Sequence, residues 1–150
     1  MSKGDIDEWD IARAGLRSIS SPEIKAFWNG YIARRDDGSI EHGSLYSRWR
    51  RVSDDLVISL YLTNRSVGLF VRGQRGERYL TTLNRLAAYE PRLGEALGAS
   101  LRGYPGCCYL TNLPLPVTDP RSWTQAYAWL EEQEELYHRA LSRLAANPAD

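Results

Sequence analysis

Arginines and glycines cluster in the stretch VRGQRGERY, which runs from residue 71 to residue 79. The preceding residues predict a strand and the following residues predict a helix, so this stretch is a loop leading into a helix N-terminus. The first N–H groups of a helix are unpaired and carry partial positive charge, which binds anions. The residue types therefore predict a site for a phosphate or carboxylate; the alternative is a flexible turn with solvated arginines. The predicted anion-binding residues are Arg72, Gly73, Arg75, Gly76 and Arg78.

A second set of candidates lies on predicted strands. Between residues 44 and 88 the chain has eight arginines, no lysine and three acidic residues, although its formal net charge is zero. If these arginines share an open sheet face with the nearby tyrosines, they form a surface of guanidinium and aromatic groups. A surface of this kind suits nucleic acid or an acidic protein segment, and the chain's own acidic ends could also cover it. The residues predicted to form this surface are Tyr46, Arg48, Arg50, Tyr61 and Tyr109.

Side-chain alternation is the reason for grouping these residues on one face. Tyr46, Arg48 and Arg50 alternate along one predicted strand. Tyr61 and Tyr109 each open a copy of the string YLTN on another strand. In both copies we expect the leucine to point toward the core and the tyrosine to lie on the opposite, open face.

Residues that could support catalysis are few. Glu134 and His138 are four residues apart on a predicted helix, where a carboxylate can orient an imidazole as a general base. Cys107 and Cys108 are adjacent, so in a strand they point to opposite faces and cannot hold one ion together. A structural zinc site needs about four ligands, and the chain has only two histidines. We expect no metal and no cofactor, and the sequence favours a non-catalytic role while leaving an enzyme open.

Composition and the chain's N-terminal residues bear on its location. No stretch approaches the roughly 20 apolar residues of a membrane helix. The N-terminus MSKGDIDEWD is acidic, whereas a signal peptide would be basic and then apolar. The two adjacent cysteines cannot link distant parts of the chain, which fits a reducing compartment. The sequence predicts a cytoplasmic protein without membrane association.

Hydrophobic periodicity predicts the elements that must position these residues. A helix over residues 20–35 begins with a Ser20 and Glu23 capping box. Three strand-like runs follow, then a helix after the arginine loop, a short helix after Pro91 and a last strand. Asp119 and Pro120 then begin a long helix that continues to residue 146. The predicted runs are SLYSRWRRV, DLVISLYLT, SVGLFVR and, for the last strand, GCCYLTNLPL.

The predicted fold class is α+β, an antiparallel sheet of about four strands packed on helices. The expected order is (α)α-β-β-β-α-α-β-α, and the length of 150 residues fits one domain. We expect an arm or short helix over residues 1–19, opened by Asp5, and a core over residues 20–146.

The stretches DLVISLYLTNRSVGLF, LGEALGASLRG and DPRSWTQAYAWLEEQEELYHRAL occur in an order that resembles a family of uncharacterised bacterial and archaeal domains. The resemblance covers residues 20–146, rests on structural positions, and implies no catalytic residue. Domains of that family often follow a nuclease-like domain, which we do not expect in this chain. The order of elements is also similar to secretion chaperones, which work as dimers holding an unfolded partner, although those proteins are usually acidic.

These observations predict a non-catalytic binding or accessory module that engages a macromolecule, most readily a protein, through the cationic and aromatic sheet face. Binding of nucleic acid or a phosphate ligand at the loop of residues 72–78 is one alternative. A secretion-chaperone-like homodimer is another. An enzyme using Glu134 and His138 is a third class, which would need both side chains to meet in a cleft.

Overall fold

The computed structural model describes residues 17–35 and 37–146. The predicted N-terminal helix beginning at Asp5 lies outside these residues. The described elements, in chain order, are α2 (Ser21–Arg35), β1 (Ile40–Ser44), β2 (Ser47–Ser53), β3 (Leu56–Leu62), β4 (Ser66–Arg72), α3 (Tyr79–Ala87), α4 (Arg92–Leu97), β5 (Cys108–Pro114), the 3-10 turn η1 (Pro120–Ser122) and α5 (Trp123–Ala146).

The strands form one antiparallel sheet in the sequential order β1-β2-β3-β4-β5. This confirms the predicted α+β class and order of elements, with five strands in place of about four. The additional strand is β1, whose sequence IEHGS has one β-branched residue and no run of alternating apolar residues. Pairing with β2 stabilises β1 as a strand, which its own composition does not predict.

Local sequence signals explain where the two principal helices begin. The Ser20 hydroxyl accepts from the Glu23 N–H at 3.3 Å, and Glu23 Oε1 accepts from the Ser20 N–H at 3.1 Å, which is the predicted capping box. Ahead of α5, the Asp119 side chain accepts from the Arg121 N–H, and Pro120 opens the short turn that leads into the helix at Trp123. The predicted start of α2 is therefore confirmed, whereas α5 begins three residues after the predicted Pro120, because Asp119 and Pro120 open a 3-10 turn first.

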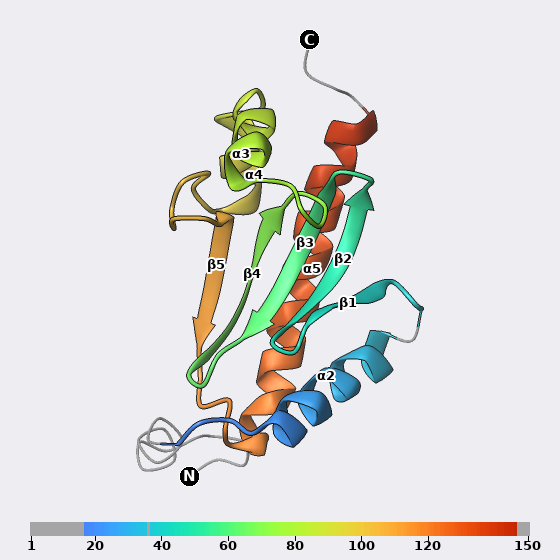
Figure 1. The fold of residues 1–150 in the computed structure, drawn as a ribbon, viewed down its shortest axis with the longest axis vertical. Coiled ribbons are helices and arrows are strands. Elements are labelled where there is room, and N and C mark those ends of the chain that lie inside the picture. The colour runs from blue at the N-terminus through green and yellow to red at the C-terminus, as the bar shows by residue number, and fades with distance from the viewer. Residues whose placement is uncertain (1–16, 36, 147–150) are drawn as a thin grey trace.

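Helices cover one face of the sheet. Figure 1 shows α5 crossing behind the strands, and α2 lying near the lower end of α5. No described helix lies in front of the strands in this view. The buried residues Ile58, Leu60 and Leu69 belong to the same hydrophobic core as Leu130 and Tyr137 of α5. We call this side of the sheet the helix face and the opposite side the open face.

Candidate functional site

The predicted surface of tyrosines and arginines is divided between the two faces of the sheet. Residues that pair across neighbouring antiparallel strands share a face. Arg48 pairs with Leu60, and Arg50 pairs with Ile58, so both arginines lie on the helix face. Tyr61 pairs with Ser47 and lies on the open face. The prediction that these residues form one surface is therefore wrong.

Arg48 is held beneath the helices. Its side chain is buried, with its guanidinium carbon 5.6 Å from the centre of the Trp28 ring. Its Nη1 donates to the carbonyls of Ser44 at 2.7 Å and Ser47 at 2.8 Å. Burial lowers the pKa of Arg48. The stacking and the two carbonyls engage the guanidinium within the protein, so Arg48 is not available to a partner.

Arg50 belongs to a buried charge cluster around Glu134, which is 0% exposed. Arg50 Nη1 donates to Glu134 Oε1 at 2.6 Å, Arg35 Nη2 lies 3.3 Å from the same oxygen, and the Tyr31 hydroxyl donates to Oε2. Burial and the neighbouring Glu134 charge raise the pKa of Tyr31. These partners use both oxygens of Glu134, so the arrangement gives no support to Glu134 orienting His138 as a base.

Tyr109 is also absent from the open face, because β5 contains a bulge. Leu69 pairs with Thr111, whereas Val71 pairs with Cys108, so β5 has one extra residue between these pairs. Tyr109 has φ 54°, is 0% exposed, and donates its hydroxyl proton to Glu90. The predicted exposure of Tyr109 is wrong, since alternation holds only in a regular strand.

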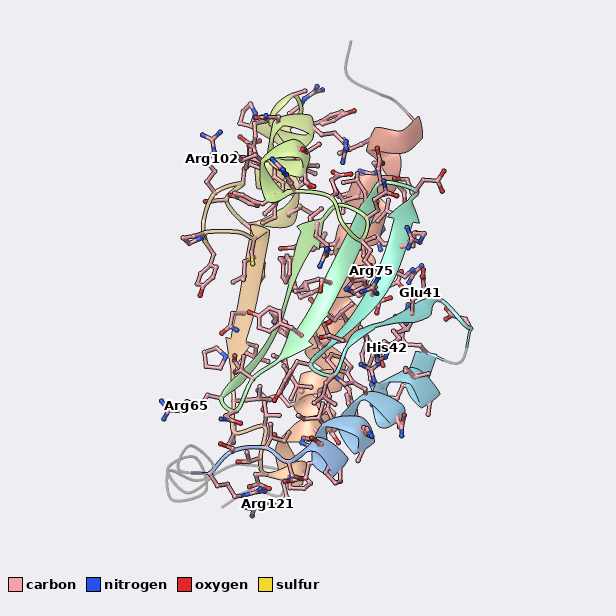
Figure 2. All side chains as sticks on the ribbon, in the orientation of Figure 1. Glu41, His42, Arg65, Arg75, Arg102 and Arg121 are labelled. Carbon is pink, nitrogen blue, oxygen red and sulfur yellow. The ribbon has the colours of Figure 1, made fainter. Side chains whose placement is uncertain are left out.

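The predicted anion-binding loop contributes to the open face. Arg72 and Arg75 place their guanidinium carbons 4.5 Å and 4.4 Å from the centre of the Trp49 ring. Arg75 reaches across the sheet, with Nη2 at 3.4 Å from the Gly43 carbonyl oxygen, and Figure 2 shows it over the centre of the strands. Trp49 is consequently only 4% exposed. The structure thus joins the loop to a tryptophan that the sequence had left outside both predicted sites.

Aromatic rings lie close against small residues on this face. A Cβ atom at Gly43 would come within 2.6 Å of Trp49 Nε1, and one at Gly68 within 2.3 Å of the Tyr61 hydroxyl oxygen. The rings of Tyr61 and Phe70 are 6.1 Å apart between centroids. Glycines therefore allow the rings to approach the backbone closely. We call Trp49, Tyr61, Phe70, Arg72 and Arg75 together the arginine-aromatic face.

The arginines of this face differ from Arg34 and Arg85, which lie on helices, in their charge partners. Across residues 17–35 and 37–146, Arg72, Arg75 and Arg78 form no ion pair, whereas Arg34 and Arg85 pair with carboxylates at 2.5 and 2.7 Å. Burial lowers the pKa of Arg72, and the nearby Arg75 lowers it further. The arginine-aromatic face therefore has positive charge that its own described residues do not neutralise.

The remaining predicted residues occupy separate positions. Tyr46 lies in the turn between β1 and β2 and is 50% exposed. Arg78 precedes α3, where its side chain makes no capping hydrogen bond. Gly76 has φ 89°, which favours glycine, and a Cβ at Gly73 would come within 2.5 Å of Glu77 Oε1. The predicted tight loop thus depends on both glycines.

Strand pairing, rather than a signal in the sequence alone, explains the position of Trp49. On the open face, the large Trp49 of β2 pairs with the small Ser59 of β3, and the large Tyr61 lies two residues further along β3. Ser59 is only 2% exposed despite lying away from the helices. A small residue opposite a tryptophan allows the ring to lie across the neighbouring strand, and this pattern depends on the pairing register, which the sequence alone did not supply.

The adjacent cysteines are poorly suited to nucleophilic chemistry. Burial raises the pKa of the Cys108 thiol to about 11 and also raises that of Cys107. Because the thiolate is the reactive form, we expect Cys108 of the native Cys107→Ser variant at pH 8 to react with a thiol reagent on the order of a hundredfold more slowly than in the unfolded variant. Absorbance stopped-flow with an aromatic disulfide reagent measures this ratio. Equal rates for the native and urea-unfolded variant would show that the Cys108 thiol is accessible and ionised.

The part of the chain that the structure describes contains no cluster of three or more histidine, cysteine or acidic side chains able to hold a metal. Of the helices described, none has the length and apolarity needed to cross a membrane.

Comparisons with known proteins give no match: no protein-family model, curated protein or solved structure is significantly similar to this chain. A functional assignment therefore depends on the geometry and chemistry of the chain itself.

Proposed function

We propose that this chain is a non-catalytic binding module that engages an acidic segment of a protein partner through the arginine-aromatic face. The observation that carries the proposal is the packing of Arg72 and Arg75 against Trp49, at 4.5 and 4.4 Å from the ring centre, without an ion pair among the described residues. Stacking holds the planar guanidinium groups in place before a ligand arrives, which lowers the entropy cost of binding.

The burial of Trp49 favours an acidic protein segment over single-stranded nucleic acid. Proteins that bind single strands stack bases on exposed aromatic rings. Here Trp49 is 4% exposed and has two guanidinium groups near its ring, so it offers little surface to a base. A carboxylate binds through hydrogen-bond donors and does not need an exposed aromatic ring for stacking. A guanidinium group supplies two parallel N–H donors that match the two carboxylate oxygens.

The Arg75→Ala variant tests the proposal. Peptides selected on the purified chain from a random peptide library should be enriched in aspartate and glutamate. The affinity of the best peptide for Arg75→Ala should fall about tenfold or more, since a hydrogen bond to a charged group contributes about 1.5–3 kcal/mol. Fluorescence anisotropy with the labelled peptide measures the dissociation constants.

Arg102→Ala is the matched control, because it removes the same charge from an exposed position. Figure 2 shows Arg102 beside the α3 and α4 region, far from Arg75. Peptide binding by this variant should stay within about twofold of the unmodified chain. Selected peptides without acidic enrichment, or equal losses for Arg75→Ala and Arg102→Ala, would refute the proposed face.

Nucleic acid remains the second candidate, because Arg72, Arg75 and Arg78 have no ion pair and Tyr104 is 56% exposed. Single- and double-stranded oligonucleotides titrated over a salt series decide between the candidates. Saturable binding that weakens steeply with salt, and is stronger than binding of the selected peptide, would favour nucleic acid. No saturable oligonucleotide binding at low salt would eliminate it.

A further inference from the structure

A small cavity adjoins the arginine-aromatic face. It has a volume of about 190 Å³ and lies where the end of β4, the arginine loop, the start of α3 and the start of β5 meet. Phe70 and Arg72 line the cavity and also belong to the arginine-aromatic face, so a ligand can contact both. The other lining residues are Val71, Gly73, Glu77, Tyr79, Thr82, Gly106 and Cys108.

The volume limits what the cavity can hold. Sites for drug-sized molecules and cofactors usually measure about 300–1,000 Å³. At about 190 Å³ this cavity is smaller, which fits one side chain of a partner better than a nucleotide or an organic cofactor.

Arg72 supplies donors at this cavity. Its Nε donates to the Gly73 carbonyl at 3.1 Å, and its guanidinium carbon lies 4.5 Å from the Trp49 ring centre. Within the described residues, neither terminal nitrogen of Arg72 has a hydrogen-bond partner. A guanidinium with both terminal nitrogens available binds a carboxylate through two parallel hydrogen bonds.

The cavity also contains a carboxylate, Glu77, whose charge is compensated. Arg85 Nη1 donates to Glu77 Oε1 at 2.7 Å, and the Thr82 hydroxyl donates to the same oxygen at 2.8 Å. The hydrogen bond from Arg85 is the largest cause of the lowered pKa of Glu77. Arg85 also lies 3.4 Å from Asp55 Oδ2, so Glu77 and Asp55 share this arginine. Among the described residues neither carboxylate forms an ion pair with Arg72, whose charge is left available to a ligand.

Apolar groups complete the lining. Phe70 and Val71 contribute from β4, Cys108 is 1% exposed, and Gly106 has no side chain to fill the space. These groups suit the methylene carbons of a glutamate side chain whose carboxylate reaches Arg72.

We propose that this cavity binds one glutamate side chain of the acidic partner segment, with its carboxylate on Arg72 and its methylenes against Phe70. This inference rests on the proposed function and adds a specificity determinant: the cavity selects glutamate at one position of the partner, while Arg75 binds another carboxylate of the acidic segment.

A double-mutant cycle tests the inference with the best peptide from the random library. Each acidic residue of that peptide is replaced in turn by its amide, and binding is measured to the unmodified chain, Arg72→Lys and Arg75→Ala. One Glu→Gln change should weaken binding about tenfold or more to the unmodified chain. The same change should have less than about a threefold effect in Arg72→Lys, because lysine keeps the charge but loses the paired hydrogen bonds.

The results separate the two proposals. If acidic peptides bind and Arg75→Ala weakens them, but no single glutamate is coupled to Arg72, the cavity inference fails and the proposed function stands. If the selected peptides show no acidic enrichment, both fail. If the dominant contact is the free C-terminal carboxylate, so that amidation of the peptide causes the tenfold loss, the glutamate assignment is overturned. Thermal melting of Arg72→Lys within a few degrees of the unmodified chain shows that the variant remains folded.

Discussion

Replacing Glu134 by glutamine is expected to lower the free energy of unfolding by about 3 kcal/mol, because it removes the one fully buried carboxylate of the cluster and leaves Arg35 and Arg50 with only the half-exposed Glu135. Glu134 is 0% exposed, and its Oε1 lies 2.6 Å from Arg50 Nη1 and 3.3 Å from Arg35 Nη2. Both arginine side chains are 15% exposed, so water replaces the lost carboxylate poorly. Urea unfolding monitored by circular dichroism measures the change.

Glu132→Gln is the control for this prediction. Glu132 is exposed on the same helix, two residues before Glu134, and its replacement removes the same charge. We expect a change of at most about 0.5 kcal/mol, as for most surface substitutions. A similarly small change for Glu134→Gln would contradict a structural role for the buried charge cluster.

Replacing Phe27 by alanine is expected to cost about 3–5 kcal/mol, the range for removing a buried phenylalanine side chain. Phe27 is 0% exposed and joins α2 to α5. Its ring centre lies 5.0 Å from that of Trp28, 5.5 Å from Trp123 and 5.0 Å from Tyr127. Truncation leaves a cavity among three large rings that cannot all move to fill it. Urea unfolding of the purified variant gives the value.

Phe70 provides the comparison, since the chain has only two phenylalanines. Phe70 is partly exposed on the open face, so Phe70→Ala should cost about 1 kcal/mol while weakening peptide binding. A loss equal to that of Phe27→Ala would mean that the open face is covered in solution. That result would remove the surface on which the proposed function depends.

Helix boundaries were predictable because their determinants are close in sequence. Ser20 and Glu23 exchange hydrogen bonds across three residues, and Asp119 accepts from the backbone two residues later. Strands β2, β3 and β4 were predicted from apolar and β-branched runs. Strand β1 was not, because a short polar segment becomes a strand only when a neighbouring edge is present to pair with it.

The assignment of faces was less predictable. Arg48 and Arg50 alternate with Tyr46 and were expected on the open face, yet their register with Leu60 and Ile58 places them under the helices. Charge at these positions is tolerated because Trp28 and Glu134, distant in sequence, lie against them. In the same way, one extra residue in β5 moved Tyr109 into the core.

Composition and local spacing were thus sufficient to identify the α+β class, the order of elements and the glycine-framed arginine loop, because these depend on residues near one another in the chain. Which arginines are buried, and that the loop lies on Trp49, were decided by strand register and by packing between distant segments. A shift of one residue moves every side chain of a strand to the other face, so only the assembled sheet shows which charges meet a partner.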